Sequence, residues 1–576
     1  MAVMLGLLAI PLVVALVALR RPTWFPILDL AMTELRVRDV GGRHTPLIGL
    51  PGRIGTLSEQ GSHPGPLSFY VLAPFYRLFG STAWAMEGAT VCLHLLASGV
   101  ALWIAHRRAG LRLVVGLTAV LALLMRAYGT GTMTEPWNPY MPLIWWVVLL
   151  LAVWSVYDGD LAMLPVGAFA ASFAAHTHSP YLGLAGGMGA LAVAGVVAAR
   201  RRPGALRWTL ISAALLLALW APPIIDQLWG SQPNITLLID HFGSPPEDPV
   251  GLGKGVELMV LHLDVWRLFT EQEAATGSLV DASQSPAGSL VPGVQFLALW
   301  SASVIAAWRM RHRALLRLDL VLGVALVLGV ISISRIFGQL WYYLMIWAWG
   351  ITALMVLAVV WTAAELLPGL RRFGLPLLGA VIVVSTLVFA VDAADSEPPA
   401  LPLSRTMSHL VPDAVEDLDD DDTYLVTWTD ALYIGSQGIS LLNELDRRGF
   451  DVGAIKPWGV PSTKHRVMEP EEADALVHLA NGFHLGRWRE KPGIVEVATF
   501  EPRSPAEIDE FERLRAEVIE ELEAIGVGER IVDVDENLFA AAIDTRIPKA
   551  TQDKMGRMLD LGLPTAVFVG PTANVE

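Results

Sequence analysis

The chain has 576 residues, of which 53% are hydrophobic and 17% are charged, against about 25% charged residues in soluble domains. Charge is unevenly distributed: residues 392–576 hold 37 acidic and 17 basic side chains (net −20), and the rest hold 19 and 24 (net +5). The acidic tail argues against a nucleic-acid partner. The mildly cationic remainder suits contact with anionic lipid headgroups or a phosphate. A single cysteine, Cys92, excludes an intrachain disulfide and a cysteine metal cluster.

Long apolar runs recur through residues 1–391. A membrane-spanning helix needs about 20 mostly apolar residues. The first run lacks a basic start and a small-residue cleavage site, so it is predicted to be a helix and not a signal peptide. The sequence predicts a polytopic α-helical membrane domain over 1–391, with about eleven transmembrane helices at 2–19, 82–105, 111–127, 141–157, 161–177, 181–199, 208–224, 293–308, 318–334, 341–362 and 374–391.

Basic residues gather in short loops that fall on one side if there are eleven spans. These loops are 106–112, 200–207, 309–317 and 371–372. The positive-inside rule assigns that side to the cytoplasm. It predicts a cytoplasmic N-terminus and an extracytoplasmic tail in a cell-membrane protein. Arg20 and Arg21 lie on the other side, but in a long loop, where the rule is weak. The outer side receives two long loops, 20–81 and 225–292.

Residues 392–576 read as a soluble α/β domain that follows a proline-containing linker and an acidic run. Alternation of strand and helix patterns indicates this class. The predicted strands are 424–428, 452–455, 494–500, 530–534 and 565–569, and the predicted helices are 435–448, 469–479 and 505–525. The most site-like residues of this domain are His465 and Arg466, although a solvated loop is the expected setting for both.

The first outer loop carries the best candidates for chemistry. Asp29 follows the first helix close to the membrane surface, where a carboxylate can act as a general base toward a hydroxyl. Glu34 is five residues further on, about 140° around a helix axis, so the two need not share a face. The alternative is an interfacial amphipathic helix with solvated charges. His63 stands in the segment Ser62-His-Pro-Gly-Pro, where a lone histidine is commonly a turn residue.

A carboxylate follows the first helix, then His63-Pro-Gly-Pro-Leu-Ser-Phe-Tyr70, then Leu78-Phe-Gly80. In their order and membrane placement these motifs resemble the opening of the GT-C glycosyltransferases. The most similar members are the protein mannosyltransferases and the lipid A aminoarabinose transferases. The resemblance covers the opening and the layout of residues 1–391, and not the tail. It implies that Asp29 is the catalytic base, that Glu34 is a second acidic residue, and that His63 lies near the donor phosphate.

Two departures from the family pattern affect the donor contacts more than the base. The family often has adjacent acidic residues, whereas Leu30 follows Asp29 here. An arginine that is common after the Leu-Phe-Gly element is replaced around Glu87.

Further outer segments fit the same resemblance, which implies substrate-binding roles for them. Trp137 and Tyr140 are alternatively aromatic anchors at the membrane interface, and His176 and His178 are alternatively polar helix ends. The candidate substrate-binding residues are Glu135, Asn138, His178, Asp226, Gln227 and Asn234.

Arg335 directly follows a long apolar run. An arginine near membrane depth is costly and is commonly paired or functional. A guanidinium fork matches phosphate oxygens, so Arg335 is predicted to bind the donor phosphate, with snorkelling to the surface as the alternative.

The resulting hypothesis is a membrane glycosyltransferase that moves a sugar from a polyprenyl-phosphate donor, with inversion. The acceptor is an extracytoplasmic hydroxyl of a cell-envelope glycan, lipid or protein. No cofactor is predicted with certainty. A divalent metal is possible, because some relatives use one, but the spacing of Asp29, Glu34, His176 and His178 fixes no geometry and no metal site is predicted. The alternatives are a lipid or glycan transporter or flippase, which predicts inverted repeats and broken helices, and a non-catalytic scaffold with a binding tail.

Overall fold

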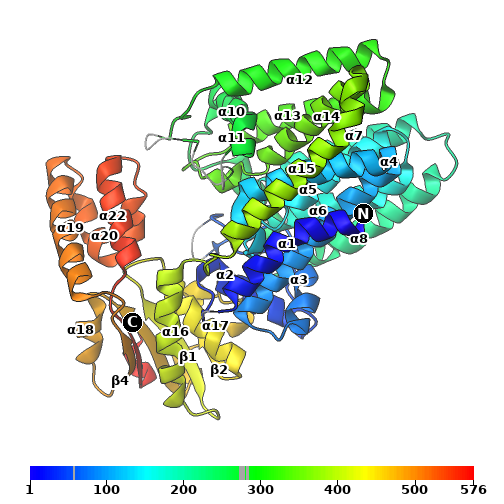
Figure 1. The fold of residues 1–576 in the computed structure, drawn as a ribbon. Helices are drawn as coiled ribbons and strands as arrows, with labels where there is room; N and C mark the ends of the chain where they lie inside the picture. The colour runs from blue at the N-terminus through cyan, green and yellow to red at the C-terminus, as the bar shows by residue number, and fades with distance from the viewer. Residues whose placement is uncertain (22, 56–58, 271–274, 276–278, 281–283, 576) are drawn as a thin grey trace. The chain divides into compact units, whose positions relative to one another are not determined.

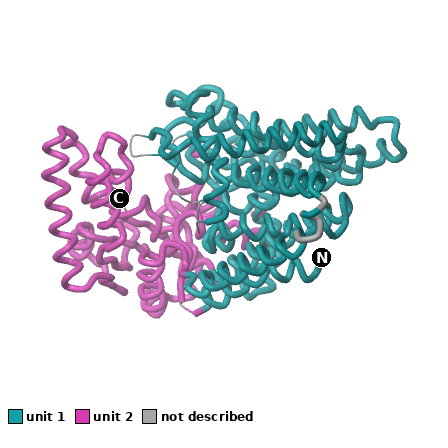
Figure 2. The backbone as a smooth tube through the Cα atoms, turned by 45° about the horizontal axis from the view of Figure 1, so that its top comes forward, with its two compact units in different colours: residues 1–20, 46–55, 61–396 teal, residues 21–45, 56–60, 397–576 magenta. Residues whose placement is uncertain are grey.

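The structure, a computed structural model, describes residues 1–21, 23–55, 59–270, 275, 279–280 and 284–575. The chain divides into two compact units, drawn in teal and magenta in Figure 2. Unit 1 comprises residues 1–20, 46–55 and 61–396, and unit 2 comprises residues 21–45, 56–60 and 397–576. The second unit therefore includes part of the first outer loop. The domain boundary at 391/392 stays a sequence-based prediction.

Unit 1 is a bundle of helices (Figure 1). Helices suit long apolar runs because they satisfy every backbone polar group within the segment. The long helices are α1 (Ala2–Leu19), α3 (Leu67–Leu78), α4 (Ala83–Thr134), α5 (Leu143–Tyr157), α6 (Leu164–Thr177), α7 (Tyr181–Ala198), α8 (Ala205–Trp229), α12 (Val291–Arg309), α13 (Arg313–Ser334), α14 (Ala348–Leu366) and α15 (Pro368–Ala393). Shorter ones are η2 (Leu161–Met163), α9 (Asn234–Gly243), α10 (Gly251–Leu261), α11 (Val265–Thr270) and η3 (Tyr342–Leu344).

Within the described ranges, eight helices are long and apolar enough to cross a membrane. Two features explain why this number is smaller than the eleven predicted spans. Helix α4 covers two of them, and its backbone is non-helical at Ala109 and Gly110, where glycine takes the left-handed φ of +67°. The apolar helices at Leu143–Tyr157 and Leu161–Thr177 are shorter. The predicted class, a polytopic helical membrane protein with a small α/β domain, is confirmed.

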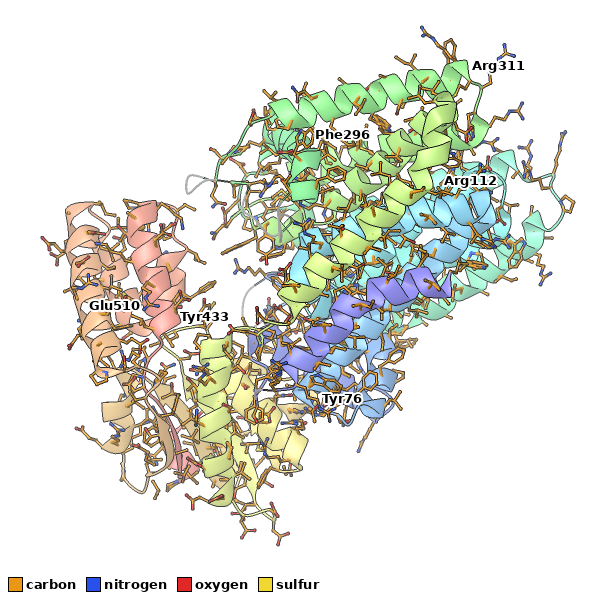
Figure 3. The ribbon with its side chains drawn as sticks, in the orientation of Figure 1. Tyr76, Arg112, Phe296, Arg311, Tyr433 and Glu510 are labelled. Atoms are coloured by element: carbon orange, nitrogen blue, oxygen red, sulfur yellow. The ribbon has the colours of Figure 1, made fainter. Side chains whose placement is uncertain are left out.

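The predicted cytoplasmic loops meet at one end of unit 1. Arg108 and Arg317 both pair with Asp158. Arg107 pairs with Asp160 at 2.8 Å, and Arg202 donates to the Gly159 carbonyl at 3.0 Å. Figure 3 shows Arg112 and Arg311 at this same end. The loops therefore share a side, as the sequence predicts; the side chains of Arg371 and Arg372 lie outside the described residues.

Unit 2 is built on a five-stranded sheet of order β2-β1-β3-β5-β4. Strands β1, β2 and β3 are parallel, and β5 runs antiparallel to its neighbours β3 and β4. Leu425, Leu476, Trp488 and Phe568 belong to its buried core. The strands are β1 (Thr423–Thr429), β2 (Asp451–Ala454), β3 (Ala475–Asn481), β4 (Val495–Phe500) and β5 (Thr565–Gly570).

Helices complete unit 2. The first, α2, comes from the first outer loop, and the others come from the tail (Figure 1). They are α2 (Leu28–Asp39), α16 (Leu401–Glu416), α17 (Ser436–Arg448), α18 (His484–Arg489), α19 (Pro505–Ala524), α20 (Ile531–Glu536), α21 (Leu538–Ala542) and α22 (Lys549–Leu561). Single 3₁₀ turns are η4 (Lys456–Trp458), η5 (Lys464–Arg466), η6 (Pro470–Glu472), η7 (Gly528–Arg530) and η8 (Thr572–Asn574).

Two predicted elements of the tail are wrong. The predicted helix 469–479 is the turn η6 followed by strand β3. The Glu469–Glu472 capping box closes only one turn, and the apolar residues that follow form the central strand, buried on both faces. The predicted strand 530–534 is η7 and the start of α20. There, Arg530 pairs with Asp533 one helical turn away, and tertiary context overrides the β-propensity of Ile531 and Val532.

Candidate functional site

Helix α2 carries the predicted base. Asp29 lies in its first turn and is partly buried, whereas Glu34 is fully buried and accepts a hydrogen bond from Asn443 at 2.9 Å. Arg36 is also buried, at 5% exposure. The charges of this helix are therefore enclosed in protein, unlike those of a solvated interfacial helix.

The residue before Asp29 has an unusual backbone. Leu28 has a φ of +43°, a left-handed conformation that is uncommon for a residue with a side chain. Such strain costs on the order of 1–3 kcal/mol and persists only where the surroundings impose it, commonly at functional sites. The assignment of Asp29 as catalytic base remains a prediction.

His63 stands in a rigid turn of unit 1. Its N–H donates to the Leu50 carbonyl at 2.8 Å, and its carbonyl accepts from the Gly49 N–H at 2.9 Å. Two residues on, Gly65 donates from its N–H to the His176 carbonyl at 3.2 Å. A side chain at Gly65 would overlap the His176 ring, since an added Cβ would lie 2.1 Å from its Nδ1. These contacts hold the backbone around His63 in place.

The imidazole of His63 is held as a neutral group. Its Nδ1 accepts from the Ser179 N–H at 3.1 Å and lies 2.9 Å from the Ser179 hydroxyl. Burial lowers the pKa of His63 to about 4. Burial, with His63 nearby, also lowers the pKa of His178 well below its usual value, and the two rings are 5.3 Å apart. A neutral His63 that accepts at Nδ1 carries its proton on Nε2, so it offers a phosphate an N–H donor and not a charge.

The predicted residues Asp226 and Asn234 join the same turn. The Asn234 amide nitrogen donates to the Ser62 carbonyl at 3.0 Å and to the His63 carbonyl at 3.4 Å. Its amide oxygen accepts from the Ser62 N–H at 2.8 Å. Asp226 accepts from the Asn234 N–H at 3.1 Å. The structure therefore brings His63, His178, Asp226 and Asn234 together, and it shows Asn234 supporting the histidine turn.

Gln227, adjacent to Asp226, makes different contacts. It exchanges two hydrogen bonds with Thr236, at 2.8 and 3.2 Å, on the exposed first turn of α9. These contacts cap a surface helix, and they lie outside the buried cluster around His63.

Aromatic rings extend the cluster toward the segment 135–140. The Trp137 ring lies 4.8 Å from that of Tyr140 and 4.9 Å from that of Tyr343. Tyr343 in turn lies 6.3 Å from His178. The Tyr140 and Tyr342 hydroxyls share a short hydrogen bond. Asn138 is buried within this segment.

Residues 341–343 are a contribution that the sequence analysis missed. They are predicted to lie in a span that begins at 341, whereas α14 begins at Ala348 and is preceded by the 3₁₀ helix η3 and a turn. The sequence feature that could have indicated this aromatic segment is the run of three aromatic residues, Trp341-Tyr-Tyr343.

Two carboxyl groups lie at the two ends of α4. Glu135 is its C-cap, and burial raises the pKa of Glu135 to about 7. Glu87, in the first turns of α4, has no exposed surface. Within the described part of the chain, neither Glu87 oxygen has a hydrogen-bond partner. Sequence reasoning noted Glu87 only as a departure from the family pattern.

Arg335 caps the C-terminus of α13, and its side chain is exposed. One turn earlier, Ser332 donates to the Pro180 carbonyl at 3.4 Å. The end of α13 therefore lies beside the turn that contains Ser179, the partner of His63. Phosphate binding by Arg335 stays a prediction.

The sequence leaves a divalent metal open. Among the described residues, no three or more His, Cys, Asp or Glu side chains are arranged to hold a metal ion. His176 packs edge-on against Trp220, with ring centroids 4.4 Å apart.

The expectation of a solvated loop at His465 and Arg466 is wrong for Arg466, which is 9% exposed. Its guanidinium donates to both oxygens of Asp39, at 2.8 and 2.9 Å. The sequence could not indicate this pairing, because the partners are 427 residues apart.

Comparison with known proteins identifies the fold. No protein-family model and no curated protein sequence matches the chain. The structure is similar to that of ArnT from Cupriavidus metallidurans bound to undecaprenyl phosphate, with a TM-score of 0.55 and 16% identity over 85% of this chain and 95% of that one. The apo form of the same protein gives a TM-score of 0.52 at 15% identity, with the same coverage.

A more distant similarity is to the oligosaccharyltransferase AglB from Archaeoglobus fulgidus, in complex with an inhibitory peptide and a dolichol-phosphate. Its TM-score is 0.36, at 12% identity over 82% of this chain and 69% of that one. The ArnT match shows that the chain has an ArnT-like fold, in agreement with the fold that the sequence motifs suggested, and its apolar helices are those of a multi-pass membrane protein.

Proposed function

We propose that the chain is a glycosyltransferase that moves a sugar from a polyprenyl-phosphate donor to an acceptor hydroxyl outside the cell membrane. One observation carries the proposal. In a fold shared with ArnT over 85% of the chain, four residues chosen from the sequence, His63, His178, Asp226 and Asn234, form one buried polar cluster. The ArnT structure holds undecaprenyl phosphate, which supports a lipid of this class as donor.

In the proposed reaction, Asp29 accepts the proton of the acceptor hydroxyl as its oxygen attacks the anomeric carbon. The bond from that carbon to the phosphate oxygen breaks, and the polyprenyl phosphate leaves. A single displacement of this kind inverts the anomeric centre. The guanidinium of Arg335 and the Nε2–H of His63 are the proposed donors to the phosphate.

The segment around Trp137 is the proposed contact for the sugar. Binding sites for small molecules combine an apolar, aromatic lining with a few polar groups that fix orientation. Trp137, Tyr140 and Tyr343 supply the rings, and Glu135 and Asn138 supply the polar groups.

The basic end of unit 1 is the proposed cytoplasmic side, by the positive-inside rule. This places the N-terminus in the cytoplasm and unit 2 outside. The acceptor is then a hydroxyl of an envelope glycan, lipid or protein.

The test is a transfer assay in membranes with a panel of polyprenyl-phosphate sugars, comparing wild type with Asp29→Asn. A general acid or base contributes about 10²–10⁴-fold, so Asp29→Asn is expected to lose at least 100-fold in turnover. The matched control is Asp240→Asn, on the exposed face of α9, which is expected to keep full activity. Full activity of Asp29→Asn would refute the base assignment. Absence of transfer by wild type with every donor would favour a transporter or a scaffold.

A further inference from the structure

Helix α2 is held by the tail at both ends. Before it, the Phe25 N–H donates to the Ser404 hydroxyl at 3.1 Å, and the Arg448 guanidinium lies 5.3 Å from the Phe25 ring centroid. At its C-terminal end, Asp39 receives the bidentate hydrogen bonds of Arg466. All of these residues belong to unit 2.

The middle of α2 meets a buried polar network on α17. Asn443 is fully buried, donates to Glu34 at 2.9 Å and accepts from Arg38 at 3.0 Å. Arg38 also binds Asp446 at 2.5 Å. Asn443 thus joins an acid and a base of α2 through a single side chain.

The loop 460–466 completes the enclosure. Arg36 donates to the carbonyls of Val460 and Pro461 at 2.6 and 3.0 Å. Arg466 bridges Asp39 and Asp446, with 3.1 Å from its Nε to Asp446. Burial raises the pKa of Asp446, but Arg466 and Arg38 outweigh burial and hold that pKa below its usual value. Arg466 is buried and its two carboxylate partners are partly buried, so removal of one partner leaves another poorly compensated.

These contacts set the position of α2. A helix of 12 residues is marginal by itself in water, so tertiary contacts decide where it lies. Leu28, next to Asp29, has strained backbone, which persists only when the surroundings impose it.

We infer that Asn443, Asp446 and Arg466 are positioning residues, and that the tail's role is to orient the helix that carries Asp29. The inference rests on the proposed function insofar as Asp29 is the base. It assigns to the acidic tail an indirect part in the reaction, through the position of α2.

The test compares Arg466→Gln, the milder Arg466→Lys, Asp39→Asn and the Asp39→Asn/Arg466→Gln double variant in the full-length protein. Three quantities are measured: amide hydrogen exchange of residues 28–39, and kcat and KM for the lipid donor. Arg515→Gln is the matched control, because Arg515 makes the same bidentate contact with Asp535 on α19 and α20.

Arg466→Gln is expected to speed exchange in α2 about tenfold and to lower kcat roughly 10- to 100-fold, because small misplacement of a reacting group has effects of this size. The KM is expected to stay within about twofold. Arg466→Lys should show a smaller effect, and the double variant should lose no more than Arg466→Gln, because the two residues act as a pair.

Unchanged α2 exchange in Arg466→Gln, or an equal kcat loss in Arg515→Gln, would overturn the inference. The outcome is separable from that of the proposed function. Asp29→Asn should lower turnover at least about 100-fold while exchange in α2 stays normal. Exchange still reports on the position of α2 if no donor supports transfer.

Discussion

Asn234 supports the His63 turn through both ends of its side chain. Asn234→Ala removes hydrogen bonds to Ser62 and His63 and leaves buried backbone groups without partners, at a cost of about 1–3 kcal/mol for each such group. We expect a lower thermal unfolding temperature in detergent and a loss of transfer. Gln227→Ala is the control, because its hydrogen bonds to Thr236 are exposed. It should change either quantity little, and equal losses in both variants would argue against a special role for Asn234.

Because His63 is buried as a neutral group, we expect the stability of the fold to fall in acid. Burial lowers its pKa from 6.5 to about 4, so between these values the unfolded chain binds a proton that the folded chain does not. The stability contributed by neutral His63 is present above pH 6.5 and is lost as pH falls toward 4, by about 3 kcal/mol in total.

Unfolding temperatures measured from pH 7.5 to 4.5 should therefore fall with pH, and His63→Gln should fall less steeply. Part of the slope should remain in this variant, because His178 faces His63 and also has a lowered pKa. An identical slope in His63→Gln would show that other groups control acid sensitivity.

At the scale of elements, the turn before α3 requires a residue without a side chain at Gly65. Gly65→Ala would place a Cβ 2.1 Å from the His176 ring, so either the ring or the turn must move. We expect lower transfer and a lower unfolding temperature, because His63 is two residues away. Gly186→Ala in α7 is the control, since its Cβ would meet nothing within 4 Å. A fully active Gly65→Ala would show that the turn tolerates displacement.

The sequence predicted those helices and strands that are determined by neighbouring residues in the chain. Strand β1, helix α17 and helix α19 are predicted from the alternation of strand and helix patterns in the tail, and α19 also has a capping box from Ser504 to Glu507. Strand β3 was missed because a central strand buried on both faces lacks the alternation that marks a half-buried one. Likewise, the short motif at His63 was found, whereas the aromatic residues 341–343 were hidden within an apolar run.

At the scale of the whole chain, the sequence showed a soluble tail but not that the tail forms a unit with residues 21–45. The contacts that join them lack any periodicity, because Asn443 and Glu34 are 409 residues apart. The charge pattern does not indicate the contacts between the tail and residues 21–45 either, because an acidic tail with scattered arginines resembles an ordinary solvated surface. Only the folded chain reveals that Arg466 and Asn443 are buried against α2.

Unit 2 contains residues 21–45 as well as the tail. We therefore expect the tail alone to be an incomplete domain. A fragment of residues 397–576 lacks Glu34 and Asp39 and so leaves Arg466 without its bidentate partner. Breaking a buried ion pair on one side costs about 3–5 kcal/mol, a large part of a typical domain's 5–15 kcal/mol.

We therefore expect the 397–576 fragment to unfold at a lower temperature, with weaker near-ultraviolet dichroism, than a fusion that joins residues 21–45 to it through a flexible linker. A fusion carrying Asp39→Asn should recover only part of the difference, because it restores the apolar contacts of α2 but not the charge of Asp39. Equal unfolding temperatures for the fragment and the intact fusion would mean that α2 adds nothing to the stability of the tail, and its buried charges would then have to be satisfied in another way.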